Sequence, residues 1–325
     1  MRSAAHLGMG MLLLAAVGSA GAQRVEKPIK VWGYSGMKPV MLRWEAVYAQ
    51  KHPEVRFENE FHGAAAAAAG LYDGAADLVV MGREMWTADS MAFHWVFQYA
   101  PFGVKVLAGG AGAPSPSYSP VVIVNRVNPL REISMAQLDA VFGSLHKTAP
   151  ENVRQWSELG VGGTLAHHAI KPVGFSEDQA LGVFWRKQVL KEDYKPNPES
   201  ELLHSEGAVV HAVEKDRAAI GYASETAVKS SNGVRVIKVD GVDASAEAIA
   251  EGQYPLTRRE SLYVNRKPGE SIEPEVEGFL LFCLGDEAQR QVRANEGYVS
   301  LPTEMRHRME NRIRGTWSGR EGWKQ

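Results

Sequence analysis

Short apolar runs alternate with amphipathic segments along this chain. Residues 29–32 form an apolar run typical of a strand, residues 39–50 place apolar side chains along one helical face, and residues 55–61 alternate between apolar and polar positions. A strand, a helix and a second strand in this order predict a parallel pair joined by a right-handed crossover. The pattern therefore predicts an α/β fold in which loops gather at the strand ends.

One strand is followed by residues suited to a binding site. Leu78 to Met81 are apolar without interruption, which is typical of a strand covered on both faces, and Gly82 and Arg83 come directly after it. Open α/β sheets bind ligands at this end of their strands. We therefore predict that Gly82 and Arg83 line a cleft, the alternative being an ordinary turn with an exposed arginine.

The same patterns predict the remaining elements. A helix begins after Gly63, and a capping box of Ser134 and Gln137 begins another. Further strands are expected at residues 104–107, 121–124, 170–173, 218–222, 234–239 and 262–264, and further helices at 181–189, 209–213, 274–284, 286–295 and 303–314. The glycine- and proline-rich residues 109–116 predict a crossing between domains, and residues 254–259 form a second candidate crossing.

The composition is that of an exported globular protein. With 325 residues, of which 45% are hydrophobic and 23% charged, the chain can bury a substantial core and favours two domains. Residues 1–22 combine Arg2, an apolar run and a small-x-small ending at Ala22, which predicts a cleaved signal peptide. The run is too short for a membrane anchor and contains no cysteine for lipid attachment. We expect a protein that is free in the periplasm or outside the cell.

Little in the sequence points to catalysis, metals or nucleic acid. The formal net charge of −2 argues against a nucleic-acid partner, and the single cysteine, Cys283, lies in an apolar stretch and is predicted to be a buried hydrophobe. His167 and His168 are adjacent and lack an H-E-x-x-H pattern, so no metal and no cofactor are predicted. Ser35 lies at a strand-to-helix turn, but Met37 stands where a nucleophile elbow requires glycine. We predict that the protein is not an enzyme, a serine hydrolase using Ser35 being the minor alternative.

Several ordered segments are similar to those of one family. They are residues 39–53 with a tryptophan, 71–77 (LYDGAAD), 121–130 (VVIVNRVNPL), 134–143 ending in VFG, 219–222 (AIGY), 252–258 (GQYPLTR) and 297–302 (GYVSLP). In this order they resemble the periplasmic binding proteins of phosphate-type ABC transporters, over nearly all of the mature chain.

The resemblance implies a type II periplasmic-binding-protein fold. Its two α/β lobes, each a mixed, mainly parallel sheet flanked by helices, would comprise residues 23–113 with 258–325 and residues 114–257, although residues 234–257 could belong to either lobe. Such a protein captures a small, here anionic, solute between the lobes by hinge closure, and a membrane permease recognises the closed form. We expect a monomer.

The resemblance also implies the site residues. The family holds an oxyanion with hydroxyls, backbone N–H groups at helix starts and an arginine. The first-lobe positions fall on Ser35 and Gly36, on Ala64, and on Gly82 and Arg83. In the second lobe the family's arginine falls near Gly174 and its hydroxyls near residues 178–180, which leaves Ser176 and Asp178 to contact the solute.

These replacements predict a changed ligand site. Each lost charge-assisted hydrogen bond weakens binding by about 1.5–3 kcal/mol, so tight binding of phosphate itself is not expected. Glu177 and Asp178 would add like charge, unless they face solvent as N-terminal helix charges. A secreted binding or interaction module that has lost small-solute binding is the main alternative.

Overall fold

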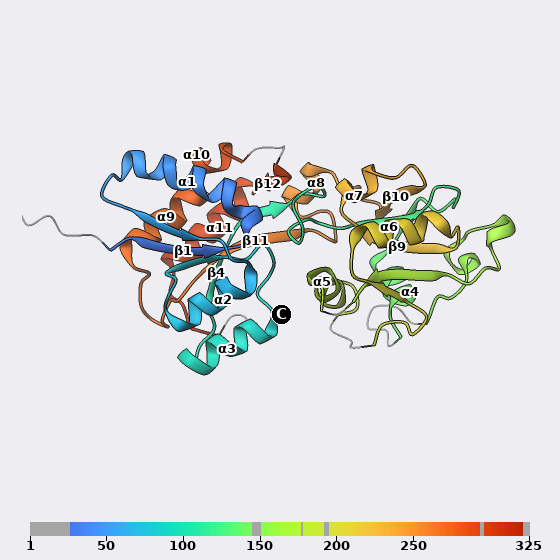
Figure 1. The fold of residues 1–325 in the computed structure, drawn as a ribbon, viewed down its shortest axis with the longest axis horizontal. Helices are drawn as coiled ribbons and strands as arrows, with labels where there is room; N and C mark the ends of the chain where they lie inside the picture. Colours follow the sequence, from blue (N-terminus) through green and yellow to red (C-terminus); the bar gives the residue numbers. More distant parts are fainter. Residues whose placement is uncertain (1–26, 145–150, 177, 192–194, 293–295, 321–325) are drawn as a thin grey trace, which may run out of the picture.

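The computed structural model describes residues 27–144, 151–176, 178–191, 195–292 and 296–320. Two six-stranded sheets with their helices lie side by side along the long axis of the molecule (Figure 1). The predicted α/β fold class is confirmed. The predicted signal peptide at residues 1–22 and Glu177 lie outside the described residues.

The first sheet is built from both ends of the chain and, with its helices, is called the first lobe. Its order is β12-β4-β11-β3-β1-β2, in which β1 is parallel to β2 and β3 while β11 is antiparallel to β3 and β4. The strands are β1 (Ile29–Gly33), β2 (Phe57–Glu60), β3 (Leu78–Val80), β4 (Phe102–Gly109), β11 (Arg258–Val264) and β12 (Tyr298–Ser300). Its helices are α1 (Lys38–Lys51), α2 (Ala64–Asp73), α3 (Thr87–Phe97), α9 (Pro274–Leu284), α10 (Asp286–Arg290) and α11 (Thr303–Arg314).

The second sheet comes from the middle of the chain and forms the second lobe. Its order is β6-β10-β5-β9-β7-β8, and β7 is parallel to both β8 and β9. The strands are β5 (Val121–Asn125), β6 (Glu132–Ile133), β7 (Lys171–Phe175), β8 (Glu201–Leu203), β9 (Ala219–Ala223) and β10 (Val234–Val239). The helices are α4 (Met135–Phe142), α5 (Ala180–Gln188), α6 (Glu206–Lys215), α7 (Glu225–Lys229) and α8 (Ala246–Glu251). Of these, α8 packs against β4 and β12 of the first lobe.

Apolar side chains account for the helix positions. The apolar face of α1 is buried, and the Trp44 indole Nε1 donates to Ala288 O at 2.7 Å, which fastens α1 to α10.

The predicted capping box is confirmed, since Ser134 Oγ accepts from Gln137 N at 3.0 Å and Gln137 Oε1 accepts from Ser134 N at 2.9 Å. Cys283 is fully buried as predicted. No helix within the described residues is long and apolar enough to cross a membrane.

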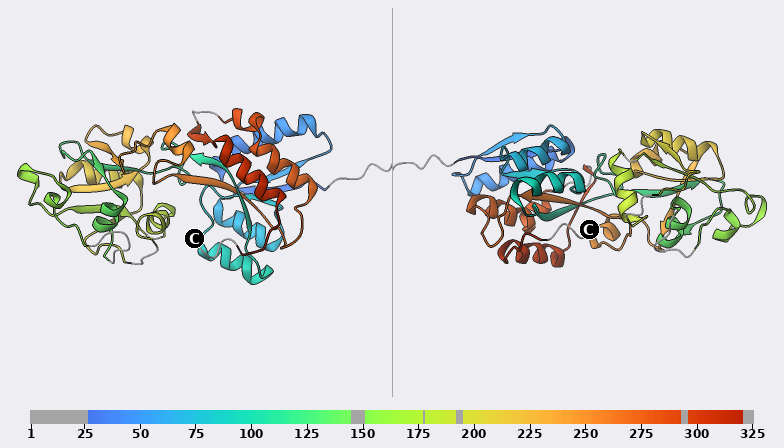
Figure 2. Two further views of the ribbon diagram at one scale, coloured as in Figure 1. Left: turned by 180° about the vertical axis from the view of Figure 1, so that it is seen from behind. Right: turned by 90° about the horizontal axis from the view of Figure 1, so that it is seen from below.

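Two crossing segments join the lobes, residues 110–120 and residues 252–257, and they run next to each other (Figure 2). Ser119 Oγ donates to Gly109 O at 2.5 Å and accepts from the backbone N–H of Arg258 at 2.9 Å. The Tyr254 hydroxyl donates to Pro120 O at 2.8 Å. These bonds tie the two segments together where they pass between the sheets.

Two predicted boundaries differ from the structure by four residues or more. The strand expected from residue 262 begins at Arg258, four residues earlier, because its first buried positions hold charged residues, Arg258 and Glu260, rather than apolar ones. The helix expected over residues 286–295 is regular only over Asp286–Arg290, and residues 293–295 lie outside the described part of the chain.

Candidate ligand-binding cleft

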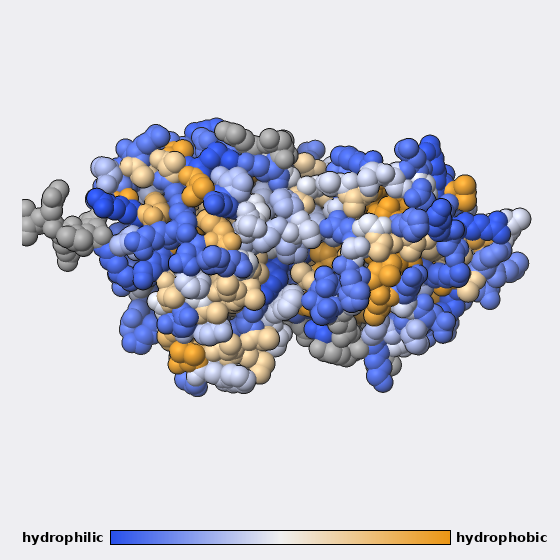
Figure 3. All heavy atoms as spheres, in the orientation of Figure 1, coloured by the Kyte–Doolittle hydropathy of each residue, from blue (hydrophilic) through white to orange (hydrophobic). Residues whose placement is uncertain are grey.

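The loops after the strands of both lobes meet at the first crossing segment. The Tyr34 hydroxyl, after β1, donates to Ser115 O, and Ser117 Oγ donates to Gly82 O, after β3, at 3.1 Å. From the second lobe, the backbone N–H of Glu225, after β9, donates to Ala111 O at 2.8 Å. The surface is notched between the lobes on the side where α3 and α5 lie (Figure 3). The strand-end rule therefore locates the candidate site in this notch.

Tyr34 fills the space beside two predicted site glycines. A Cβ atom on Gly36 would lie 2.4 Å from Tyr34 Cε1, and one on Gly82 would lie 2.1 Å from Tyr34 Cδ1. Gly82 also has a φ of +65°, in the left-handed region that favours glycine. Both glycines thus allow an aromatic ring to rest on the backbone of the predicted site. Ser35, next to Tyr34, is exposed and begins a short 3₁₀ turn that leads into α1.

Ala64 lies at the start of α2, as predicted. Gly63 precedes it with a φ of +104°, and its N–H donates to Gly33 O at 3.0 Å, which holds the beginning of α2 beside the end of β1. Ala64 contributes a backbone N–H from the first turn of a helix and no side-chain donor.

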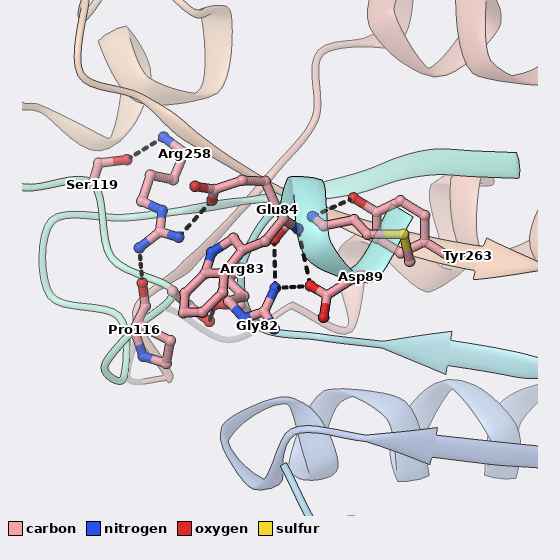
Figure 4. Close-up of polar contacts among 11 residues, drawn as sticks. Gly82, Arg83, Glu84, Asp89, Pro116, Ser119, Arg258 and Tyr263 are labelled. Carbon is pink, nitrogen blue, oxygen red and sulfur yellow. Dashed lines mark hydrogen bonds and ion pairs between the residues drawn. The ribbon is translucent and has the colours of Figure 1, made fainter. Parts of the chain in front are cut away.

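Arg83 is engaged within the first lobe (Figure 4). Its side chain is 5% exposed, and Nη1 donates to Asp89 Oδ2 at 2.6 Å and to Glu84 O at 2.9 Å. The guanidinium also stacks over Trp86, 4.0 Å from the ring centroid. Asp89 Oδ2 also accepts from the backbone N–H of Trp86 at 3.0 Å, so the same carboxylate caps the N-terminus of α3 and neutralises Arg83. The cation predicted for the solute therefore already has a protein counter-ion.

A second arginine, missed by the sequence analysis, lies at the junction of the lobes (Figure 4). The Arg258 side chain is 1% exposed, and its Nη2 donates to Glu84 Oε2 at 2.7 Å while Nη1 donates to Pro116 O. Its guanidinium lies 4.9 Å from the ring centroid of Phe184, on α5 of the second lobe. Burial opposes ionisation of Glu84, but the charge and hydrogen bond of Arg258, a backbone hydrogen bond and the charge of Lys187 together outweigh it and lower the pKa of this carboxyl. The ion pair thus joins the loop after β3 to the start of β11, and the same guanidinium also contacts the first crossing and α5.

Further carboxylates surround this junction. Glu260 is fully buried two residues after Arg258, and burial raises its pKa to about 7 although Arg258 opposes the shift. Glu206, at the start of α6, accepts from Ser224 Oγ. Burial together with repulsion from Glu260 and Glu206 raises the pKa of Tyr34. The junction therefore holds acids whose negative charge would oppose an anion bound nearby.

In the second lobe, Ser176 and Asp178 lie at the end of β7, where His204, after β8, joins them. Ser176 Oγ donates to Asp178 Oδ1, a bond that lowers the pKa of this exposed carboxyl, and lies 3.1 Å from His204 Nδ1. While the Ser176 hydroxyl donates to Asp178, His204 Nδ1 can pair with Ser176 Oγ only as a donor. The sequence analysis missed His204, since nothing near it in the chain marks it as a neighbour of β7.

The geometry offers little support for serine hydrolysis or metal binding. Among the hydrogen bonds of the described residues, none joins Ser35 to a histidine, as a hydrolytic serine would need. Within the same part of the chain, no three His, Cys, Asp or Glu residues are grouped as a metal site requires. Hydroxyl, carboxylate and backbone groups lie at the strand ends of the two lobes, around the first crossing segment.

The fold and site define a class, the two-lobe substrate-binding proteins. The model of the PBP superfamily domain matches residues 18–287. The chain belongs to this superfamily, and its relatives include phosphate-type substrate-binding proteins, in agreement with the resemblance seen in the sequence.

Individual relatives agree with this assignment. The phosphate-binding protein PstS of Pseudomonas aeruginosa is 27% identical over 281 residues, which cover 84% of this chain and 83% of that protein. Among solved structures, the ABC-type phosphate transport receptor of Vibrio cholerae superposes with a TM-score of 0.58 at 17% identity, over 84% of this chain and all of that one. PstS of Borrelia burgdorferi has a TM-score of 0.59 at 15% identity, over 86% of this chain and all of that one. At these identities the structures support the fold alone, and they confirm the predicted two-lobe architecture.

Proposed function

We propose that this protein is the exported solute-binding component of a phosphate-type ABC transport system, and that it captures a small polar solute between its lobes by hinge closure. The family and the PstS relative, named as phosphate-binding, support a binding function that works together with a permease. The paired crossing segments support the hinge. We keep the predicted lobe boundaries, residues 23–113 with 258–325 and residues 114–257, and the monomeric state as part of this proposal.

Phosphate is not the high-affinity ligand in this proposal. The observation that carries this conclusion is the neutralisation of both arginines at the lobe junction, Arg83 by Asp89 at 2.6 Å and Arg258 by Glu84 at 2.7 Å. A desolvated dianion needs charge-assisted donors that are not already saturated. Glu260, fully buried two residues from Arg258, adds a further acid near the junction.

The site geometry supports a solute with hydrogen-bonding groups and little negative charge. In the first lobe we propose backbone contacts from Gly36, Ala64 and Gly82, and a hydroxyl contact from Ser35. In the second lobe we propose Ser176 and Asp178, which would accept hydrogen bonds from hydroxyl or amino groups. Arg83 is assigned to holding the loop after β3 against α3 rather than to the solute.

Native mass spectrometry of the gently purified mature protein tests this proposal. We expect one small molecule per chain to remain bound and to be lost in Ser176→Ala. It should be retained in Ser230→Ala, since Ser230 Oγ donates only to Ala227 O within its own helix end. A preparation without any adduct, which also gave no thermal shift with a library of polar solutes, would favour the interaction module instead.

A further inference from the structure

One buried carboxyl at the lobe junction is left without a well-formed hydrogen bond. Glu260 lies two residues after Arg258 on β11, so both side chains project from the same face of the strand, and Glu260 is fully buried. Neither of its carboxylate oxygens accepts a well-formed hydrogen bond from any described residue. β11 and β4 also change register between Glu260 and Ser261, and such bulges re-aim side chains near functional sites. A buried carboxyl in this state calls for a physical explanation.

The hydroxyl of Ser117, in the first crossing, is within reach of both Glu260 and the loop after β3. Its Oγ donates to Gly82 O at 3.1 Å and accepts from the Tyr298 hydroxyl at 3.1 Å. Its interaction with Glu260 lowers the pKa of that carboxyl, against the larger effect of burial. A serine hydroxyl has one proton to donate. Ser117 can therefore donate to Gly82 O or to Glu260, but not fully to both.

The charged and titratable groups around Glu260 come from several elements. They are Arg258 and Tyr263 on β11, Glu84 after β3, Tyr34 after β1 and Tyr298 on β12. Burial raises the pKa of Glu260 to about 7, and repulsion from Glu84 adds to the rise. The three tyrosines stay protonated at neutral pH because burial and the nearby carboxylates raise their pKa values. Glu84 stays ionised there because Arg258 is the main influence that lowers its pKa. Within this set, Glu260 is the group that changes charge near neutral pH.

We propose that Glu260 is a positioning residue for the loop after β3, and that its protonation state decides whether Ser117 holds this loop. When Glu260 is protonated, the Ser117 hydroxyl donates to Gly82 O, as in this structure. When Glu260 releases its proton to solvent, its carboxylate takes the hydrogen bond of Ser117, because a charge-assisted hydrogen bond is stronger than one to a neutral carbonyl. Gly82 O then loses its donor, and the loop after β3 is released from the first crossing.

The proton on Glu260 and the position of Gly82 are thus coupled, and such coupling is reciprocal. A solute that binds while Ser117 holds Gly82 raises the affinity of Glu260 for its proton. The same solute binds more tightly below pH 7 than above it, because the pKa of Glu260 is about 7. This pH dependence of binding rests on the proposed contact between Gly82 and the solute, whereas the coupling within the protein is independent of that contact.

Nuclear magnetic resonance of the mature protein, labelled with ¹³C at glycine carbonyls and ¹⁵N at arginine, tests the coupling without any solute. Two Gly-Arg pairs in the sequence give signals, Gly82–Arg83 and Gly319–Arg320. We expect the Gly82 carbonyl resonance to shift with a midpoint near pH 7. The Gly319 carbonyl accepts from the backbone N–H of Ala100 at 3.1 Å, and its resonance should stay constant over the same range.

Three variants identify the origin of the shift. Glu260→Gln removes the titrating group and Ser117→Ala removes the hydroxyl that transmits its effect, so each should abolish most of the Gly82 shift. Glu45→Gln is the matched control, because Glu45 is also buried with its pKa raised to about 7, but it accepts from Asn59 Nδ2 at 2.6 Å between α1 and β2. This control should keep the Gly82 shift. The proposal is overturned if the wild-type resonance does not move where Glu260 titrates, if Glu260→Gln or Ser117→Ala retains the full shift, or if Glu45→Gln abolishes it.

Discussion

Neutralising Asp89 should destabilise the first lobe far more than neutralising an exposed carboxylate. Asp89→Asn keeps the shape of the side chain and can still accept from the Trp86 N–H, so the start of α3 should survive. What it removes is the counter-charge of Arg83, whose side chain is 5% exposed. Breaking a buried ion pair by removing one partner costs about 3–5 kcal/mol. Since Asp89 itself is 14% exposed, we expect a loss near the lower limit, about 3 kcal/mol.

Glu270→Gln provides the matched control. The Lys267–Glu270 ion pair has the same length, 2.6 Å, but the side chains are 63% and 57% exposed. Exposed pairs contribute about 0–1 kcal/mol, so this variant should unfold with nearly the wild-type free energy. Because the two ion pairs have the same length and differ in burial, the difference between the two losses in stability measures the effect of desolvation.

Urea denaturation followed by circular dichroism measures both variants. The double variant Arg83→Met/Asp89→Asn should be less destabilised than the sum of the single variants, with a coupling energy of about 1–3 kcal/mol. If Asp89→Asn lost less than about 1 kcal/mol, Arg83 would not depend on Asp89 for its counter-charge, and its assignment away from the solute would fail.

Three further predictions concern the cleft and the core. Glu84→Gln leaves the Arg258 guanidinium without its counter-ion, so the free energy of unfolding in urea titrations should fall by about 3 kcal/mol. A loss within experimental error would mean that the pair does not stabilise the junction. Burial raises the folded-state pKa of Glu45 from 4.5 to about 7, so ionisation of this carboxyl should cost the folded protein about 3 kcal/mol as the pH rises from 4.5 to above 7. Glu45→Gln should remove this part of the loss and leave the part due to Glu260, whose pKa is also raised to about 7. Gly82→Ala, whose Cβ would meet Tyr34, should lower the melting temperature more than Gly160→Ala, which has a similar φ of +76° and open space; equal losses would show that only the backbone conformation matters.

The fold was predictable because local patterns carry it. The uninterrupted apolar run at residues 78–81 indicated a central strand, and the strand β3 lies between β1 and β11. The glycine- and proline-rich segment indicated the first crossing, and Ser134 with Gln137 indicated the start of α4. Each of these features depends on residues close together in the chain, where propensity and hydrogen bonding act directly.

The site was less predictable because its charges pair across the fold. Glu84 and Arg258 are separated by 174 positions, and no local pattern shows that they meet. Because β11 begins with charged residues, the sequence pattern predicted a loop where the structure has a buried strand. The partner of Arg83 could have been predicted from the sequence. Asp89 lies in the first turn of the following helix, where a carboxylate commonly caps the helix N-terminus. His204 could be located only once β7 and β8 were paired.

Calorimetric titration of the mature protein with inorganic phosphate tests the central claim most directly. Because Asp89 and Glu84 neutralise both arginines at the lobe junction, we predict no saturable heat at micromolar phosphate, in the wild type or in Arg83→Ala. Tight binding of phosphate by the wild type, abolished in Arg83→Ala, would contradict this claim and show that Arg83 binds the ligand.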